Sequence, residues 1–348
     1  MRSYAMPGFG GALVERIEPA PVPTGSEVLM RVDASGVCHS DLHIWEGGFD
    51  LGGDKRLDFR PFVTLPHTLG HEIAGTVIAC GPEVQGVAVG DRRVVYPWIG
   101  CGRCARCSAG DEHLCATPAA LGTRRRGGFS DTVLVPHARY LFDFAGVREE
   151  FACTCACSGL TAFSALKKAA PAARGEPLLI IGAGGVGLAA IRLACSVYGV
   201  APVVAEIDLS KWDAARAAGA AKIIDPRDAD ALKTLMNDTG GVVAAIDFVG
   251  AQASASFAMG VLRKGGRLVL VGLFGGALEI ALPLLPLRAI SLIGSFVGSL
   301  AEMQELMALA RAGQLQEIPL QRRSLSSAQQ TLEELKQGRI IGRVVLQP

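Results

Sequence analysis

The stretch "LLIIGAGGVGLAAIRLA", residues 178–194, decides the fold of the second half of the chain. Apolar residues precede its G-x-G-x-x-G motif and a helix-like pattern follows, which is the context that this otherwise weak motif needs. Gly182 permits a tight turn, Gly184 lets the backbone approach a pyrophosphate, and Gly187 lets helix and strand pack closely. The alternative is a glycine-rich turn in the core. We predict a dinucleotide site with its phosphates on the helix N-terminus. Its residues are Gly182, Gly184, Gly185, Val186 and Gly187.

The pattern around this stretch predicts a doubly wound α/β domain. Apolar runs alternate with helical stretches, and the runs are continuously apolar, as in a sheet that is buried on both faces. Alternation of strand and helix indicates βαβ units and a parallel sheet. The strand candidates are residues 177–182, 201–208, 221–226, 242–250 and 266–272, and the helical candidates include 211–219 and 230–238.

An acidic residue follows the second of these strands. Glu206 lies 24 residues after Gly182, near the place expected for a carboxylate that binds the ribose hydroxyls of the cofactor. A carboxylate there repels a 2′-phosphate, and no arginine immediately follows it. We therefore predict NAD rather than NADP. Asp208 is the rival acid, but we expect it to cap the next helix.

Residues 1 to about 155 predict a second, β-rich domain. Short β-like runs such as "EVLMRVDASGV" and "EIAGTVIAC" are broken by glycine and proline, which favours a barrel-like domain with long loops. Residues 49–64 form an excursion that we interpret as a pocket rim or a subunit contact. After the α/β region in the sequence, we predict two amphipathic helices, at residues 301–313 and 326–338. A last strand is predicted at "RVVLQP".

Composition and charge exclude several classes of partner. The chain has 348 residues with 34 basic and 33 acidic side chains, and the net charge of +1 gives no reason to expect nucleic acid or an anionic membrane. The N-terminus lacks the apolar core of a signal peptide, and glycine, proline or arginine interrupts the most apolar stretches. We therefore expect a cytoplasmic protein without a membrane span.

Four of the ten cysteines indicate a metal site. They are spaced C-x2-C-x2-C-x7-C, so their thiolates can surround one tetrahedral zinc ion that is closed to other ligands. Disulfides between residues three apart would be strained. A zinc ribbon for nucleic acid is the alternative, but two arginines without a lysine are too few for a phosphate footprint. The predicted ligands are Cys101, Cys104, Cys107 and Cys115.

A second, catalytic metal is suggested by separate segments. Cys38 in "GVCHSDLH" and His71 in "LGHEIAG" offer two ligands, whereas a catalytic zinc needs about three. The stretch "CTCACSGLT" offers Cys153, Cys155 and Cys157 directly before the nucleotide-binding domain. Taken singly, each of these cysteines is more often a small core residue. The residues alone do not say which of the three, if any, binds metal.

The chain resembles the zinc-dependent medium-chain alcohol dehydrogenases over essentially its whole length. The resemblance is carried by "GVCHSDLH", "GHE", the four-cysteine lobe, "CSGLT", "GAGGVG" and the terminal "IGRVVL". It is closest to microbial members, which are usually homotetramers; a homodimer is the alternative. It implies a GroES-like catalytic domain over residues 1–157, a Rossmann domain over 158–295 and a return to the catalytic domain over 296–348.

The resemblance selects one cysteine of "CTCACSGLT" as the third ligand. The family motif is C-x-G-x-T, and only Cys157 has Gly159 and Thr161 at the right offsets. Cys153 and Cys155 are then packing residues, and Thr161 touches the nicotinamide ring. The implied cofactors are NAD and two zinc ions per subunit, one catalytic and one structural.

The resemblance also implies a proton path. Asp41 hydrogen-bonds His71 and fixes its tautomer. Glu72 is an outer or transient zinc ligand. Ser40 takes the proton of the alcohol and passes it through the nicotinamide ribose to His43, which faces solvent.

Further roles follow for the cofactor and the pocket. His39 stands where the family often has an arginine that contacts the pyrophosphate, which weakens NAD binding or makes it pH-dependent. Arg343 matches the family's other pyrophosphate-binding arginine, and Lys211 joins the cofactor site. Trp98 and Trp45 are the predicted pocket aromatics.

The predicted function is the reversible NAD-dependent oxidation of primary or secondary alcohols to aldehydes or ketones. A polyol dehydrogenase is the nearest alternative, but polyol relatives commonly replace the third cysteine by an acidic residue. A dehydrogenase for another hydroxy substrate, including a hydroxyacyl-CoA, is a further alternative. A zinc-free quinone reductase is excluded if the metal binds. A redox-inactive sensor or scaffold would not need Ser40 and His43.

Overall fold

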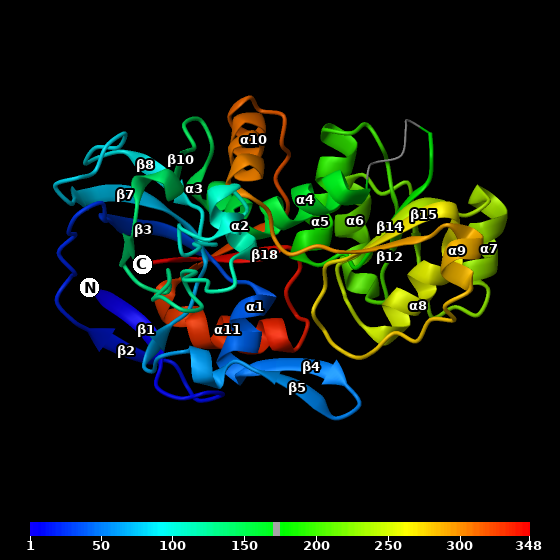
Figure 1. The fold of residues 1–348 in the computed structure, drawn as a ribbon, viewed down its shortest axis with the longest axis horizontal. Helices are drawn as coiled ribbons and strands as arrows, with labels where there is room; N and C mark the ends of the chain where they lie inside the picture. Colours follow the sequence, from blue (N-terminus) through cyan, green and yellow to red (C-terminus); the bar gives the residue numbers. More distant parts are fainter. Residues whose placement is uncertain (170–174) are drawn as a thin grey trace.

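The structure, a computed structural model, describes residues 1–169 and 175–348. A largely antiparallel sheet and a parallel sheet form the two halves of the molecule, on the left and right of Figure 1. Within the described residues, no helix has the length and apolar character needed to cross a membrane.

The second half of the chain forms a six-stranded parallel sheet in the order β13-β12-β11-β14-β15-β16. This is the order of a doubly wound nucleotide-binding domain, with its switch point between β11 and β14. The predicted fold class is confirmed. The strands are β11 (Leu178–Ile181), β12 (Val203–Ala205), β13 (Lys222–Ile224), β14 (Val242–Asp247), β15 (Leu262–Leu270) and β16 (Ser291–Gly294).

Helices cover both faces of this sheet, which explains its continuously apolar strands. Leu178 and Ile180 of β11 pack in one core cluster with α5, whereas Leu179 and Ile181 pack in another with α7 and α8. Successive side chains of a strand point to opposite faces, so both sets must be apolar. The helices are α4 (Leu160–Ala169), α5 (Gly185–Ser196), α6 (Trp212–Ala218), α7 (Ala231–Thr239), α8 (Gln252–Val261) and α9 (Leu284–Arg288).

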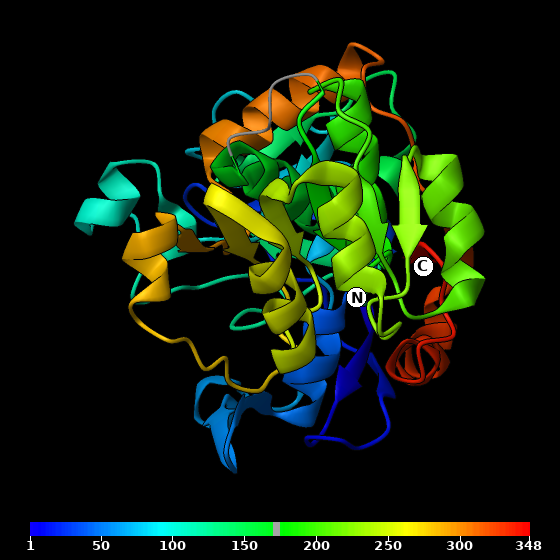
Figure 2. The ribbon, with the colours of Figure 1, turned by 90° about the vertical axis from the view of Figure 1, so that its right-hand side faces the viewer.

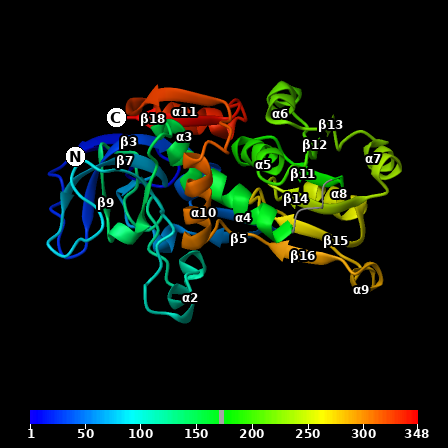
Figure 3. The ribbon, with the colours of Figure 1, turned by 90° about the horizontal axis from the view of Figure 1, so that it is seen from above.

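The first half contains a seven-stranded sheet that the end of the chain completes. Its order is β10-β8-β7-β3-β18-β17, and β9 also pairs with β3. The last strand, β18, therefore lies beside β3 (Figure 3). The strands are β3 (Val28–Gly36), β7 (Glu72–Cys80), β8 (Arg92–Val95), β9 (Thr132–Val135), β10 (Leu141–Asp143), β17 (Leu320–Ser324) and β18 (Arg343–Gln347). A three-stranded sheet of β1 (Arg2–Met6), β2 (Val14–Ile17) and β6 (His67–Thr68) accompanies it.

The pairing of β3 with β7 explains why distant segments meet. Gly36 lies opposite Glu72 in this antiparallel pair, so the residues just after β3 and just before β7 are neighbours. Cys38 starts α1 (His39–Glu46) at one end, and His71 precedes β7 at the other. The short π-helix η4 (Cys155–Gly159) joins α3 (Glu149–Thr154) to α4 and carries Cys157.

The C-terminal helices agree with the prediction. α10 (Leu300–Arg311) starts with a capping box of Ser299 and Glu302, and α11 (Ala328–Lys336) buries one apolar face. The short 3₁₀ turns are η1 (Arg60–Phe62), η2 (Glu112–Leu114), η3 (Ala138–Tyr140), η5 (Leu209–Lys211) and η6 (Leu325–Ser327).

Two excursions leave the first half. The predicted excursion at 49–64 begins with a hairpin of β4 (Gly48–Gly52) and β5 (Lys55–Asp58). There, Gly52 and Asp50 lie so close to Gly276 and Gly275 that an added Cβ on Gly52 or Gly275 would clash. The hairpin thus contacts the nucleotide-binding half. The second excursion is the four-cysteine lobe with α2 (Ala105–Ser108), which projects from the body of the molecule in Figures 2 and 3.

Candidate metal centre and cofactor site

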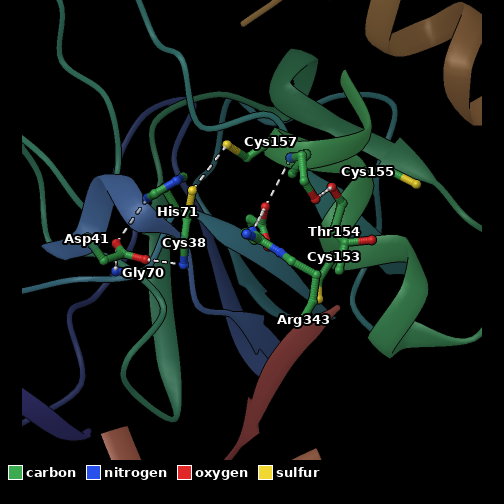
Figure 4. A network of polar contacts seen from close by, with 12 residues as sticks. Cys38, Asp41, Gly70, His71, Cys153, Thr154, Cys155, Cys157 and Arg343 are labelled. Atoms are coloured by element: carbon green, nitrogen blue, oxygen red, sulfur yellow. Dashed lines mark hydrogen bonds and ion pairs between the residues drawn. The ribbon is translucent and has the colours of Figure 1, made fainter. Parts of the chain in front are cut away.

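Three buried side chains converge where β3, β7 and η4 meet. The ligand atoms of Cys38, His71 and Cys157 all lie within 4.8 Å of one another (Figure 4). The two sulfur atoms are 3.9 Å apart. A hydrogen bond with the Cys157 thiol lowers the pKa of Cys38, which favours the thiolate that a metal requires.

The other two cysteines of "CTCACSGLT" lie apart from this set. Cys153 and Cys155 donate their thiol hydrogens to the carbonyl oxygens of Glu150 and Phe151 in α3, at 3.3 and 3.6 Å. In Figure 4 the Cys155 sulfur points away from Cys38 and His71. Burial raises the pKa of Cys155 to about 12, so this thiol stays neutral. The geometry singles out Cys157.

Asp41 orients the histidine of the ligand set. Its Oδ1 lies 3.0 Å from Nδ1 of His71, and its carboxylate accepts the backbone N–H groups of Cys38 and Gly70 at 2.9 and 3.1 Å. Nε2 of His71 is buried and has no hydrogen-bond partner within the part of the chain that the structure describes. Two thiolates and one free imidazole nitrogen fit a catalytic zinc with three protein ligands. The partner at Nδ1 leaves Nε2 to the metal.

A buried ion pair connects this set to the glycine loop. Glu72 accepts the backbone N–H of Ser158 at 3.0 Å and pairs with Arg343 at the start of β18. The aliphatic part of Arg343 fills the space where a Cβ on Gly185 would lie. Nε of this arginine is buried and has no hydrogen-bond partner among the described residues. A cation beside a helix N-terminus with unused N–H groups fits a pyrophosphate.

The glycine loop has the geometry that its motif predicts. Gly182 has a φ of +92°, which residues with a side chain rarely adopt. A Cβ on Gly187 would collide with the Gly182 carbonyl. Gly184, the N-cap of α5, has no heavy atom within 4 Å of its Cβ position. A tight turn, an open face for phosphate and a close helix–strand contact therefore occur in the expected order.

Glu206 lies beside this loop. Its carboxylate accepts the backbone N–H groups of Ala183 and Asp208 at 2.6 and 2.8 Å, and only 6% of the residue is exposed. Asp208 caps η5, as predicted, by accepting the Ser210 N–H at 3.0 Å, and it pairs with Lys211. Arg227, which the sequence prediction missed, donates to the Ile207 carbonyl at 2.7 Å in the same corner.

Helix α1 presents the predicted relay residues next to Cys38. Ser40 and His43 lie about one turn apart and are both half-buried. Burial lowers the pKa of His43. The His43 ring lies 4.4 Å from that of Phe49, and the His39 ring lies 5.4 Å from that of Phe274 in the nucleotide-binding half.

Of the two predicted pocket tryptophans, only Trp98 lies at the ligand set. Its ring centroid is 5.3 Å from that of His71, and its indole N–H donates to Ala156 at 3.1 Å. Trp45 instead packs in the core beneath α1 and donates to Gly11 at 2.7 Å, so its predicted place in the pocket is corrected. Five residues after Ser40, its side chain leaves the helix roughly 140° away from Ser40.

The four lobe cysteines form the second ligand set. Their sulfur atoms lie within 4.8 Å of one another. The neighbouring Glu112 is buried, accepts the Tyr140 hydroxyl at 2.6 Å and pairs with Arg139 at 3.0 Å. This carboxylate anchors the lobe to η3 and β10. The thiols are Cys101, Cys104, Cys107 and Cys115, and four of them fit a closed structural zinc.

The comparisons with known proteins agree with this geometry. The family model described as "Alcohol dehydrogenase GroES-like domain" matches residues 24–144, and that described as "Zinc-binding dehydrogenase" matches residues 185–312. The chain is 36% identical to an NAD-dependent alcohol dehydrogenase of Sulfurisphaera tokodaii, and to one of Saccharolobus solfataricus, over 100% of each chain.

Solved structures extend the similarity to three dimensions. The alcohol dehydrogenase of Aeropyrum pernix superimposes with a TM-score of 0.89 at 28% identity, covering 100% of both chains. The D-arabinose dehydrogenase of Sulfolobus solfataricus superimposes with a TM-score of 0.83 at 26% identity, again over 100% of both. By its two matched domains and its full-length relatives, the chain belongs to the zinc-binding alcohol dehydrogenases of the medium-chain dehydrogenase/reductase superfamily.

Proposed function

We propose that this protein is an NAD-dependent zinc alcohol dehydrogenase that reversibly oxidises primary or secondary alcohols to aldehydes or ketones. The observation that carries the proposal is the buried set of Cys38, His71 and Cys157 with an unpartnered Nε2, tied through Glu72 and Arg343 to the glycine loop. Metal ligands and cofactor loop are thereby held within one network, as hydride transfer between a bound alcohol and a nicotinamide requires.

When bound, zinc supplies a Lewis acid that lowers the pKa of the alcohol, and NAD supplies the hydride acceptor. Cys38, His71 and Cys157 would hold the catalytic ion, and the four lobe cysteines a second, structural one. Asp41 keeps the His71 ring in its ligating orientation. Glu72 balances the charge of Arg343 beside the thiolates.

The chain's own residues provide the route for the proton. Ser40, two residues after Cys38, would accept the proton that the alcohol hydroxyl releases, and His43, about one turn further along α1, would take the proton on toward solvent. Burial lowers the pKa of His43, so its imidazole is neutral near pH 7 and able to accept a proton. Thr161, on the first turn of α4, would touch the nicotinamide ring.

The cofactor residues extend along the glycine loop. Arg343, the open face at Gly184 and the N–H groups of Gly185 and Val186 would bind the pyrophosphate. Glu206 would accept the adenosine ribose hydroxyls and Lys211 would lie beside them. His39, in contact with Phe274, occupies the place of a pyrophosphate-binding arginine and weakens that subsite.

A sugar or polyol is the second candidate substrate. It is favoured by a relative that is 30% identical over 94% of this chain and 92% of its own, named D-arabinose 1-dehydrogenase (NADP(+)). Trp98 and Phe296, which meet edge to face at a centroid distance of 5.6 Å, make the wall beside His71 aromatic. An aromatic wall favours an apolar alcohol.

We also propose that the protein assembles as a cytoplasmic homo-oligomer, a tetramer or at least a dimer. β16 is an edge strand, and among the strands that the structure describes it pairs with β15 alone. Leu292 within this strand is exposed, as are Leu282 and Leu287 before it. An apolar sheet edge of this kind is a ready interface for a second copy.

The test is NADH formation by the purified protein with a panel of primary, secondary and aromatic alcohols, polyols and aldoses, repeated with NADP. We expect the highest kcat/KM for a monohydric alcohol with NAD. Highest activity on an aldose or polyol would replace the substrate class, and activity confined to quinones would overturn the proposal. Light scattering gives the oligomeric state, and a monomer would contradict the assembly.

A further inference from the structure

The segment that follows β16 is strained at one residue. Val297 has a φ of +39° and is only 6% exposed. Positive φ is an outlier for a β-branched side chain, and such strain persists only where the surroundings enforce it. Strained residues cluster at functional sites, so the contacts that hold Ser295–Gly298 show what the strain maintains.

Both ends of Ser295–Gly298 are fixed by side chains from elsewhere in the chain. Ser295 donates its N–H to Leu270 at 2.8 Å, and its hydroxyl accepts from the Lys168 ammonium at 2.9 Å. At the other end, the carbonyl oxygen of Gly298 accepts the buried Tyr96 hydroxyl at 2.8 Å.

Gly298 is also wedged between its neighbours. A Cβ on this glycine would lie 2.7 Å from Leu160, which starts α4 next to Thr161. Burial raises the pKa of Tyr96, so its hydroxyl remains a donor over the whole working pH range. The Tyr96 bond therefore holds the end of the segment that is nearest to the strained residue.

The strained segment determines where the Phe296 side chain lies. Phe296 precedes Val297 and packs edge to face on Trp98, at a centroid distance of 5.6 Å, and Trp98 in turn lies against the ligand His71. Phe296 also lines a groove of about 700 Å³ between the lobe, α4 and α10. The Phe296 ring therefore separates Trp98 from this groove.

We propose that Tyr96 is a positioning residue that sets the alcohol specificity: by holding Gly298 it keeps Val297 strained and Phe296 pressed against Trp98. The inference rests on the proposed function, because it takes the space at Trp98 and His71 as the alcohol pocket. Without the Tyr96 hydroxyl, the backbone at Val297 relaxes and the Phe296 ring moves away from Trp98 toward the groove. The alcohol pocket then becomes larger, and the enzyme selects less strictly for small alcohols.

The test compares Tyr96→Phe with Tyr140→Phe. The two tyrosines stack at 6.3 Å and 11°, and each uses its hydroxyl for one buried contact to a distant residue: Tyr96 to Gly298 and Tyr140 to Glu112. If Tyr96 had a purely structural role, the two variants would change the substrate preference equally. We expect Tyr96→Phe alone to change the ratio of kcat/KM for propan-1-ol to that for 1-phenylethanol, lowering it about 3- to 10-fold, the effect of one hydrogen bond. The KM for NAD should stay at the wild-type value.

Two further variants separate the possible outcomes. In a Phe296→Ala background the effect of Tyr96→Phe on the ratio should vanish, because Tyr96 acts through that ring. Val297→Gly removes the strain and leaves the Tyr96 anchor in place, so by itself it should leave the ratio at the wild-type value, because glycine adopts a positive φ without cost. An unchanged ratio in Tyr96→Phe, or an equal change in Tyr140→Phe, would overturn this inference and leave the proposed function standing. A wild type without NAD-coupled alcohol oxidation would overturn both.

Discussion

His43 is the residue that we propose takes the proton out of the pocket, and its surroundings determine when it can accept one. Its ring packs against Phe49 and near His39, and burial lowers its pKa below the ordinary value. The neutral imidazole accepts a proton and the charged one cannot. Alcohol oxidation should therefore fall as the pH drops through this lowered pKa.

The first prediction follows from this direction of the pKa shift of His43. The acid limb of kcat/KM for alcohol oxidation should have its midpoint below about pH 6.5, the ordinary histidine value. His43→Gln should lose this limb and lower the rate about 10-fold or more at pH 7, as expected for a proton-transfer residue. His113→Gln is the matched control, since burial lowers its pKa too, and it lies in the lobe, two residues before Cys115, rather than on α1 beside Cys38. An acid limb that is the same in His43→Gln as in the wild type would contradict the relay.

We expect Glu206 to decide between the two nicotinamide cofactors. Hydrogen bonds to a charged group contribute about 1.5–3 kcal/mol each, and a 2′-phosphate would lose them and face an anion. We predict that the wild type prefers NAD by at least about 10-fold in kcat/KM. Glu206→Ala should erode this preference by weakening NAD use, and Ile207→Arg should improve NADP use beside Arg227. Asp213→Ala, an exposed acid on α6, serves as control. Equal use of NAD and NADP by the wild type would remove Glu206 from the site.

Trp98 and Trp45 illustrate how far single residues can be placed from sequence. The family resemblance placed Trp98 in the substrate pocket, because relatives have a pocket aromatic just before the lobe. Trp45 follows His43 in sequence, yet it points into the core, because helix geometry separates side chains that are two residues apart. Phe296 and Arg227 carry no motif. Only the fold brings them to Trp98 and to the corner of Glu206.

The elements that the sequence predicted are those with a strong local pattern. β11 and β12 are continuously apolar, and β14 is apolar up to Asp247, because both faces of the sheet are covered. The glycine loop marks the start of α5. β16 escaped prediction because it is a four-residue edge strand with exposed positions. The β4–β5 hairpin also lacks a regular alternation, and its contact with Gly275 and Gly276 depends on tertiary packing.

The lobe is the element whose role differs most from that of the ligand set. Four thiolates around one zinc would leave no position for a substrate, so the binding energy of the zinc that we propose there is folding energy. We predict that Cys104→Ala lowers the melting temperature by roughly 10 °C, or prevents assembly. The protein that remains folded should keep Cys38, His71 and Cys157 loaded and active. Abolished activity at an unchanged melting temperature would show that the lobe metal takes part in the reaction.

At the scale of the whole molecule, the end of the chain completes the active site. β18 pairs with β3 just before Cys38 and carries Arg343 to Glu72 and to the glycine loop. Tyr96 and the β4–β5 hairpin add further contacts between the halves. No sequence pattern predicts such pairs, because their members lie far apart in the chain. Only the resemblance to a family placed Arg343 at the cofactor, and its pairing with Glu72 emerged from the fold.

The central claim is that Cys38, His71 and Cys157 hold the zinc at which NAD-dependent alcohol oxidation occurs. The most direct test is NADH formation by the wild type, Cys157→Ala and Cys155→Ala, with zinc per subunit measured on the same samples. We predict two zinc ions and full activity for the wild type and for Cys155→Ala. Cys157→Ala should keep one zinc and the fold but lose about 10³-fold in rate, since the Lewis acid contributes several kcal/mol. Near wild-type oxidation by Cys157→Ala, or loss of that zinc in Cys155→Ala, would contradict the claim.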